Sequence, residues 1–234
     1  MSITHEEQKE RWNKEHQTPL ALKQIDARKG SSGLAPFLEF LRQKDLNDLT
    51  GLEMCCGKGR NVIWLARKKE IQKMYGFDFS SVAIEEAKKR ASEENVANKT
   101  HFDLMDASEP WKYDSNIFDF SIDCFASTDI EDSKLRQFAA DEMYRVIKPS
   151  GYFLVYVMST DDEYHKIMIE KSPAGEQGAF IQPDAGKFEK VFSEEELDSM
   201  YRKYKLIEAR RIEKMAEFFG KSYYNKHHWR LYQK

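Results

Sequence analysis

Little cysteine and no long apolar run characterise this sequence of 234 residues. Its three cysteines are Cys55, Cys56 and Cys124, and their number and spacing suit neither a disulfide framework nor a zinc site. No apolar stretch reaches the roughly 18 residues of a membrane-spanning helix. The polar and acidic start of the chain does not resemble a secretory signal. We therefore expect a cytoplasmic protein with reduced thiols, no bound metal and no membrane partner.

An excess of positive charge is also absent, since the formal net charge is −3. This argues against a nucleic-acid partner. Residues 201–234 nevertheless carry ten Lys or Arg against three Asp or Glu, with aromatic residues interleaved, as in some proteins that bind single strands. Edge strands with aromatics inside and bases outside explain the same composition more simply. An RNA-modifying or RNA-binding protein that uses this segment is the alternative hypothesis.

Hydrophobic residues make up 41% of the chain, which is enough apolar material for the core of one ordinary domain. We predict a single domain over residues 1–234. Its parts are an N-terminal helical cap (1–45), a central core (48–158), an insertion or lid (159–192), and a C-terminal helix with strands (193–234).

Apolar periodicity predicts strands that alternate with helices. The first predicted strand ends near residue 55. The others cover residues 73–77, 100–105, 117–124, 151–158, 206–215 and 228–233. The predicted helices cover 34–43, 60–69, 81–94, 128–147 and 163–171, with a short one after Ser193. This order is typical of an α/β fold, with a largely parallel sheet and helices on both faces.

A glycine turn joins the first predicted strand to its helix and carries most of the functional information. Gly57 and Gly59 allow the backbone to approach a ligand, and the helix that begins there points free N–H groups toward it. Asp78 follows at the end of the second strand. Strand, glycine turn, helix, strand and carboxylate together predict half of a nucleotide-binding unit.

Two common nucleotide-binding signatures are missing from this turn. A dinucleotide fingerprint needs a third glycine where Val62 stands, and a shifted register would need one at Cys55. A P-loop needs Ser or Thr after a Gly-Lys pair, but here Lys58 precedes Gly59. Both absences argue against NAD(P) and ATP.

Five motifs in order resemble the class I S-adenosylmethionine-dependent methyltransferases. They are Glu53-Met-Cys-Cys-Gly57-Lys-Gly59, Gly76-Phe-Asp-Phe-Ser80, Leu104-Met-Asp-Ala107, Phe118-Asp-Phe-Ser-Ile-Asp-Cys-Phe125 and Glu142-Met-Tyr-Arg-Val-Ile-Lys-Pro-Ser-Gly-Tyr-Phe-Leu154. The resemblance makes 48–158 the cofactor-binding core. It implies a Rossmann-like sheet of seven strands, mostly parallel, with the last antiparallel. Cys55 stands where the family has its first motif glycine, and Ser150 replaces a later one.

The resemblance also implies roles for individual residues. Glu53 would orient the amino group of S-adenosylmethionine, Asp78 would accept from both ribose hydroxyls, and Asp106 would accept from the adenine amino group. Phe79 would pack on the adenine face. The implied cofactor-binding residues are Glu53, Cys55, Cys56, Gly57, Gly59, Asn61, Asp78, Phe79, Asp106, Ala107, Cys124 and Phe125.

Signals for the methyl acceptor are weaker. Family members that methylate amino groups of nucleobases or glutamine often carry Asn/Asp-Pro-Pro-Tyr after the fourth strand. This chain reads Cys124-Phe-Ala-Ser-Thr-Asp-Ile130 instead, which argues against that subclass. The candidate catalytic residues are Asp129, Tyr164 and His165, and a His base has a suitable pKa to deprotonate an acceptor.

We expect the N-terminal cap and the insertion to cover the carboxyl ends of the strands, where ligands bind in open α/β sheets. Such a covered site favours a small-molecule acceptor with an O, N or S nucleophile. The adjacent His227 and His228 are further candidates, although neighbours in a strand cannot both line one pocket. The protein is predicted to be a monomer or homodimer.

Overall fold

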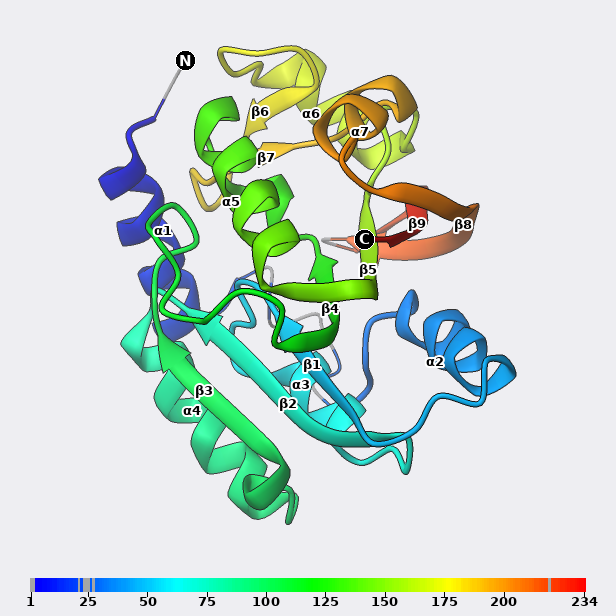
Figure 1. Ribbon diagram of the computed structural model, residues 1–234. Coiled ribbons are helices and arrows are strands. Elements are labelled where there is room, and N and C mark those ends of the chain that lie inside the picture. Colours follow the sequence, from blue (N-terminus) through cyan, green and yellow to red (C-terminus); the bar gives the residue numbers. More distant parts are fainter. Residues whose placement is uncertain (1–2, 21, 23–25, 27, 219) are drawn as a thin grey trace.

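The computed structural model describes residues 3–20, 22, 26, 28–218 and 220–234 of the protein. Within them, one sheet has seven strands in the order β3-β2-β1-β4-β5-β9-β8 (Figure 1). Its strands are β1 (Leu49–Glu53), β2 (Ile71–Asp78), β3 (Thr100–Leu104), β4 (Phe118–Cys124), β5 (Ile147–Met158), β8 (Lys205–Phe218) and β9 (Lys221–Gln233). β1 to β5 pair in parallel, whereas β9 is antiparallel to β5 and β8. This confirms the predicted Rossmann-like sheet with its last strand antiparallel.

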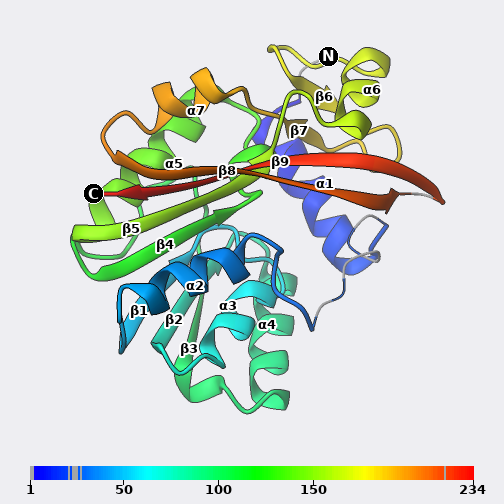
Figure 2. The ribbon, with the colours of Figure 1, turned by 90° about the vertical axis from the view of Figure 1, so that its right-hand side faces the viewer.

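Helices cover both faces of the sheet (Figure 2). One face carries α2 (Leu34–Gln43), α3 (Arg60–Ala66) and α4 (Ser81–Glu93), and the other carries α5 (Ser133–Val146) and α7 (Glu194–Met200). Each face buries its own apolar cluster because successive side chains of a strand point in opposite directions. On β5, Leu154 and Tyr156 join the first cluster, while Phe153 and Val155 join the second.

Most predicted element boundaries lie close to the observed ones, but three starts are wrong. The strand predicted from 228 begins at Lys221, the strand predicted from 151 begins at Ile147, and one helix begins late. The helices predicted at 34–43 and 163–171 occur at those bounds. The helix predicted from 128 begins instead at Ser133, while Thr128 lies in a short 3-10 turn, η3 (Ser127–Asp129). The reason is the Asp132 side chain, which accepts from the N–H groups of the next turn and caps the helix there.

The insertion contains more regular structure than expected. It holds α6 (Glu163–Lys171) and a two-stranded sheet of β6 (Ala179–Ile181) and β7 (Phe188–Lys190). The N-terminal helix α1 (His5–Gln17) connects this insertion to η3. Gln8 of α1 donates to the carbonyl oxygens of Asp129 and Phe188 and accepts from the Phe188 N–H. One glutamine thus binds the cap to both the core and the insertion.

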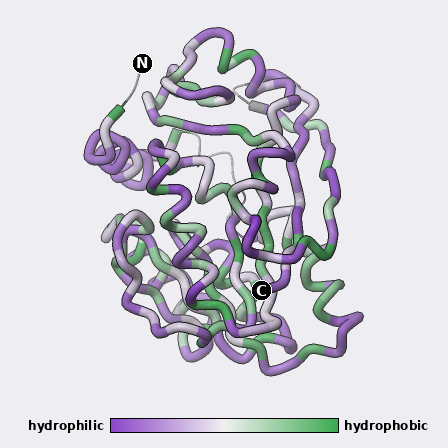
Figure 3. Tube along the Cα trace, turned by 45° about the horizontal axis from the view of Figure 1, so that its top comes forward, coloured by the Kyte–Doolittle hydropathy of each residue, from purple (hydrophilic) through white to green (hydrophobic). Residues whose placement is uncertain are grey.

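Helix α1 is hydrophilic along most of its length (Figure 3). Thr4 and Glu7 form a capping box at its first turn. Because few apolar side chains are available for packing, polar contacts must hold α1 against the rest of the protein. The predicted cap also includes residues 1, 2, 21, 23–25 and 27, and the predicted C-terminal segment includes 219; these lie outside the described residues. A further 3-10 turn, η2 (Ala97–Lys99), directly precedes β3.

Candidate active site

The turn between β1 and α3 passes through three residues in left-handed backbone conformation. Cys55, Gly57 and Gly59 have φ values of 49°, 52° and 72°. A Cβ on Gly59 would lie 2.9 Å from the Phe102 ring and 3.0 Å from the Ala87 Cβ, so β3 and α4 leave room only for glycine. Cys55 adopts this backbone despite its side chain, which costs strain energy. The turn predicted from the two glycines is therefore present.

Glu53 is a buried carboxyl group directly before this turn, with 3% of its surface exposed. Its Oε1 accepts from Asn61 Nδ2 at 2.7 Å, and Asn61 Oδ1 accepts in turn from the Ser31 N–H at 2.8 Å. Its Oε2 has no hydrogen-bond partner among the described residues. Burial raises the pKa of Glu53 to about 8, against the opposing hydrogen bond from Asn61. A cationic N–H donor at Oε2 would satisfy both the orphaned oxygen and the charge.

Asp78 lies opposite the turn, at the end of β2. Its Oδ2 accepts from the Gly57 N–H and its Oδ1 from the Ser80 N–H, both at 2.9 Å. Burial raises the pKa of Asp78 to about 6, although both hydrogen bonds oppose that rise. Each carboxylate oxygen has a second lone pair, so Asp78 can also accept from two hydroxyl groups.

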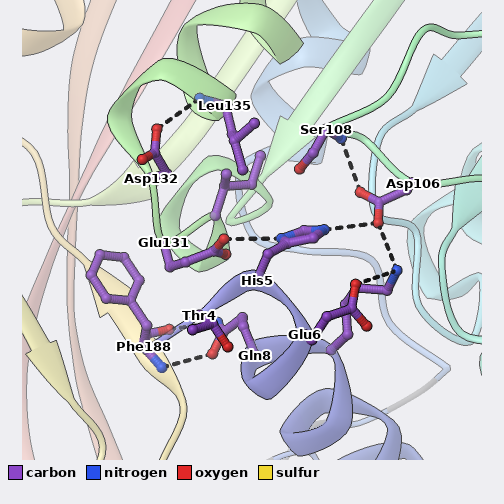
Figure 4. A network of polar contacts seen from close by, with 12 residues as sticks. Thr4, His5, Glu6, Gln8, Asp106, Ser108, Glu131, Asp132, Leu135 and Phe188 are labelled. Carbon is purple, nitrogen blue, oxygen red and sulfur yellow. Dashed lines mark hydrogen bonds and ion pairs between the residues drawn. The ribbon is translucent and has the colours of Figure 1, made fainter. Parts of the chain in front are cut away.

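Asp106, after β3, is covered by the start of α1 (Figure 4). Its Oδ2 lies 2.9 Å from His5 Nε2 and 3.2 Å from Lys9 Nζ, while its Oδ1 accepts from the Ser108 N–H. The other ring nitrogen of His5 lies 2.9 Å from Glu131 Oε1. Two carboxylates on one imidazole favour its doubly protonated form. Burial alone would lower the pKa of His5, but the two carboxylates outweigh it and the net shift is upward.

Two smaller groups complete the predicted adenine side. Phe79 is half-buried after β2, and Lys9 Nζ lies 5.9 Å from its ring centroid. Ala107 is buried, and its carbonyl oxygen accepts from Trp111 Nε1 at 3.1 Å. Both therefore lie beside Asp106 and Asp78, as the sequence motifs imply.

The end of β4 forms the opposite wall. Phe125 has a φ of 70°, which is rare for a bulky side chain, and its ring packs on Tyr156 and His227. Burial raises the pKa of Cys124, Cys55 and Cys56 well above the ordinary value of a thiol. These cysteines are therefore protonated at neutral pH and suit a lining role better than a nucleophilic one.

The three predicted catalytic residues lie on two elements, α6 and η3. Tyr164 and His165 lie on α6, and His165 Nδ1 is 2.5 Å from Asp162 Oδ1. Burial raises the pKa of Tyr164 to about 12. Asp129 lies in η3, where burial raises the pKa of its carboxyl group well above the ordinary value. In the part of the chain that the structure describes, no hydrogen bond or ion pair joins Asp129 to His165.

The histidine pair on β9 has separate partners. His227 Nδ1 lies 2.7 Å from the Tyr156 hydroxyl, and His228 Nε2 lies 3.0 Å from the Phe192 carbonyl oxygen. His227 is thus closer to the Phe125 side of the site than His228 is.

Sequence reasoning missed several residues that contact this site. His5 and Lys9 bind Asp106, and His16 Cε1 lies 3.5 Å from where a Cβ on Gly57 would be. Burial lowers the pKa of His16 to about 4, so it is neutral. The capping box at Thr4 was the one local signal for this helix, and it says nothing about what the helix touches.

A family model described as a methyltransferase domain matches residues 52–151, the segment that holds the glycine turn and all three carboxylates. This match supports the resemblance to the class I S-adenosylmethionine-dependent methyltransferases. The predicted family and cofactor are thereby confirmed. The unsatisfied Glu53 Oε2 and the glycine cradle fit the ammonium and methionyl part of that cofactor.

Individual relatives match this chain over different lengths. A demethylmenaquinone methyltransferase of Leptospira interrogans is 29% identical over 103 residues, which are 44% of this chain and 40% of that protein. The match therefore spans less than half of the relative. A methyltransferase structure from Methanosarcina mazei shares the fold, with a TM-score of 0.71, 22% identity, and coverage of 83% of this chain and 96% of that one.

A third similar structure is the 1,6-didemethyltoxoflavin-N1-methyltransferase of Burkholderia thailandensis with its substrate and S-adenosylhomocysteine bound. It has a TM-score of 0.66 at 13% identity and covers 100% of this chain and 91% of that one. Among the described helices of the present chain, none has the length and apolarity to cross a membrane. The described His, Cys, Asp and Glu residues form no group of three or more suited to a metal ion.

Proposed function

We propose that this protein transfers the methyl group of S-adenosylmethionine to an O, N or S nucleophile of a small molecule. The observation that carries the proposal is the buried pair of Glu53 and Asp78 on either side of the Gly57 turn. Both carboxyl groups have raised pKa values through burial, and Glu53 keeps one oxygen unpaired. A ligand with one ammonium group and a ribose diol satisfies both.

S-adenosylmethionine supplies an activated methyl group when bound, so the chain mainly has to hold and align the reactants. Glu53 would accept from the ammonium group, Asp78 from the ribose hydroxyls and Asp106 from the adenine amino group. Alignment of bound reactants is worth about 7–11 kcal/mol in favourable cases. A general base is therefore not required for a nucleophile that is already deprotonated.

For an acceptor that must lose a proton, His165 is the best-placed base among the predicted catalytic residues. The Asp162 carboxylate on Nδ1 holds the ring and favours a proton at that nitrogen, which leaves Nε2 to accept one. Tyr164, with its pKa raised to about 12, suits a hydrogen-bond donor. Asp129 would act as a neutral carboxylic acid, because burial raises the pKa of its carboxyl group.

The covered position of the site favours a small acceptor. The Gln8 contacts connect α1, η3 and β7 above the carboxyl ends of the strands. Closure of this kind excludes water and leaves little room for a folded macromolecule. The structurally similar Burkholderia thailandensis enzyme also has a small molecule as its substrate.

The contacts of the C-terminal segment do not favour RNA binding. Several of its bases pair with acids, among them Lys203 with Asp141 and Arg230 with Glu194. Its aromatic residues Tyr201, Trp229 and Tyr232 are buried in the core. Bases that are already paired and rings that are buried offer neither the free charge nor the stacking surface that a single strand needs.

The proposal is tested by calorimetric titration with S-adenosylmethionine and S-adenosylhomocysteine, with NAD as control ligand. We expect micromolar binding of both by the wild type and at least about 100-fold weaker binding by Asp78→Ala, because two charge-assisted hydrogen bonds are lost. Asp119→Ala is the matched control, since Asp119 binds the Thr50 N–H and Lys148 away from the turn. Folded wild-type protein that binds neither ligand would overturn the proposal.

Acceptors are then sought by incubating the protein with labelled S-adenosylmethionine and fractionated metabolites. We expect label in a small molecule, and none in RNA.

A further inference from the structure

Lys187 is one of the largest fully buried side chains of the protein, with 1% of its surface exposed. It lies directly before β7 and after Gly186. Its Nζ stands 3.5 Å above the centre of the Trp12 ring of α1. Lys187 of the insertion thus lies against the N-terminal helix.

This ammonium group has no anionic partner in direct contact. Among the described residues, no carboxylate lies within ion-pair distance of Lys187, and the Trp12 ring is its one close polar or aromatic contact. The other buried lysine of the same hairpin, Lys190, forms an ion pair with Glu196 at 2.7 Å. A buried charge without a partner is costly, so a cation at this position calls for an anion that the protein itself does not supply.

Asp129 is an acidic group whose charge interacts with that of Lys187. The Lys187 charge acts to lower the pKa of Asp129, although burial has the larger and opposite effect. No ion pair closes the distance between the two side chains in the described part of the chain. The charge of Lys187 therefore acts on Asp129 without a direct ion pair between the two side chains among the described residues.

Unsatisfied polar atoms belong to residues that contact Lys187 directly or through one neighbour. Trp12 Nε1, His16 Nδ1 and Gln182 Oε1 are buried and have no hydrogen-bond partner among the described residues. The Trp12 and His16 rings are 5.7 Å apart, and His16 in turn reaches the Gly57 turn. Several orphaned groups between the cofactor turn and Lys187 indicate a polar ligand that bonds to them.

We infer that Lys187 recognises an anionic oxygen of the methyl acceptor, which is a carboxylate or an ionised hydroxyl group. The inference rests on the proposed function and narrows its acceptor to a small organic anion. Lys187 would supply a charge-assisted hydrogen bond in a water-poor site, where such a bond is strong. A neutral acceptor would leave the buried ammonium group of Lys187 without an anionic partner.

The test uses the protein saturated with S-adenosylhomocysteine and two matched pairs of probes, measured by ligand-observed NMR. Benzoate is compared with benzamide, and 4-nitrophenolate with 4-nitroaniline, so the two pairs distinguish a carboxylate site from an ionised-hydroxyl site. We expect the wild type to prefer at least one anion over its neutral partner. Lys187→Met should weaken the binding of that anion by about 10–100-fold, which is the range expected for the loss of a hydrogen bond to a charged group. The binding of the neutral probe should not change.

Two variants control for charge and for folding. Lys187→Arg keeps the cation and should keep the preference, and Lys166→Met removes an exposed lysine of the same insertion and should change nothing. Without ligand, Lys187→Met should unfold at the same or a higher temperature, because it removes an unpaired buried charge. No anion preference in the wild type, or an equal one in Lys187→Met, overturns the inference.

The two hypotheses fail in different ways. Failure of the wild type to bind S-adenosylhomocysteine would overturn the proposed function. Normal binding of S-adenosylhomocysteine by wild type and Lys187→Met, with no anion preference, would overturn this inference alone.

Discussion

Replacing Glu53 by glutamine should make the ligand-free protein more stable and less able to bind its cofactor. Glutamine has nearly the same shape, and its carbonyl oxygen can still accept from Asn61. What it removes is a buried carboxyl group whose pKa is raised from 4.5 to about 8. The substitution therefore isolates the energy of keeping an ionisable group at this position without a cation.

The pH dependence follows from that shift. Below the unfolded pKa of 4.5, the carboxyl group is neutral in both folded and unfolded protein and costs nothing extra. Between 4.5 and about 8, the unfolded chain ionises and the folded chain does not, so stability falls as the pH rises. The wild type should lose about 1.4 kcal/mol per pH unit relative to Glu53→Gln, or about 2.7 kcal/mol over two units. Above the pKa of Glu53 in the folded protein, the stability difference between the wild type and Glu53→Gln no longer changes with pH.

Urea unfolding of both proteins at three pH values, spaced about one unit apart within that window, measures the effect. Glu93→Gln is the control, because Glu93 is exposed on α4 and its replacement should give a constant difference. A stability difference between Glu53→Gln and wild type that does not change with pH would refute the reasoning.

Cofactor binding provides an independent check of the same carboxyl group. If the ammonium group of S-adenosylmethionine pairs with Glu53, binding near neutral pH must ionise Glu53 and release its proton. Calorimetry in buffers of different ionisation enthalpy should detect up to about one proton released by the wild type. The Glu53→Gln variant should lack this release and bind at least about 10-fold more weakly, because it loses a charged hydrogen bond.

Three further predictions concern the cap and the turn. His5 has a raised pKa, so its protonated form holds α1 in place at low pH, and this stabilisation is lost as the pH rises through that pKa. Hydrogen exchange of the α1 amides should therefore become faster across this pH range in the wild type. In His5→Ala, the exchange should show no such titration. Cys55→Gly should raise stability in urea unfolding by up to about 1 kcal/mol, because it removes a Cβ at positive φ. An unchanged or lower midpoint would contradict that account. Gly51→Ala should lower the free energy of unfolding by about 1–3 kcal/mol or more, because the added Cβ would collide with the Phe120 ring. Gly175→Ala is the control. Its added Cβ meets no atom within 4 Å, so the free energy of unfolding should hardly change in the same assay.

The elements that sequence reasoning predicted well are those with local causes. The helices predicted over 81–94 and after Ser193 begin where expected, because the Ser80 and Ser193 side chains bond N–H groups only three residues away. The error at Thr128 arose among equally local signals, since Asp132 offered a competing cap four residues later. Two adequate caps in one segment cannot be ranked without knowing where the helix packs.

The cofactor side of the site was also largely readable from the chain. Glu53 and Asp78 stand at the ends of strands that are neighbours in the sheet, and the glycine turn marks where the backbone must approach a ligand. In a parallel sheet the carboxyl ends of adjacent strands meet, so residues far apart in sequence have predictable positions there.

The contacts of α1 and the insertion, in contrast, were decided by tertiary structure. His5, His16 and Lys187 have no motif around them, and each matters because of what lies against it: Asp106, the Gly57 turn and the Trp12 ring. The sequence by itself determined the sheet, the turn and the carboxylates, because periodicity and short-range hydrogen bonds encode them. Only the packing of α1 and the insertion over the strand ends decided which charges are buried together, because that depends on contacts between segments more than 100 residues apart.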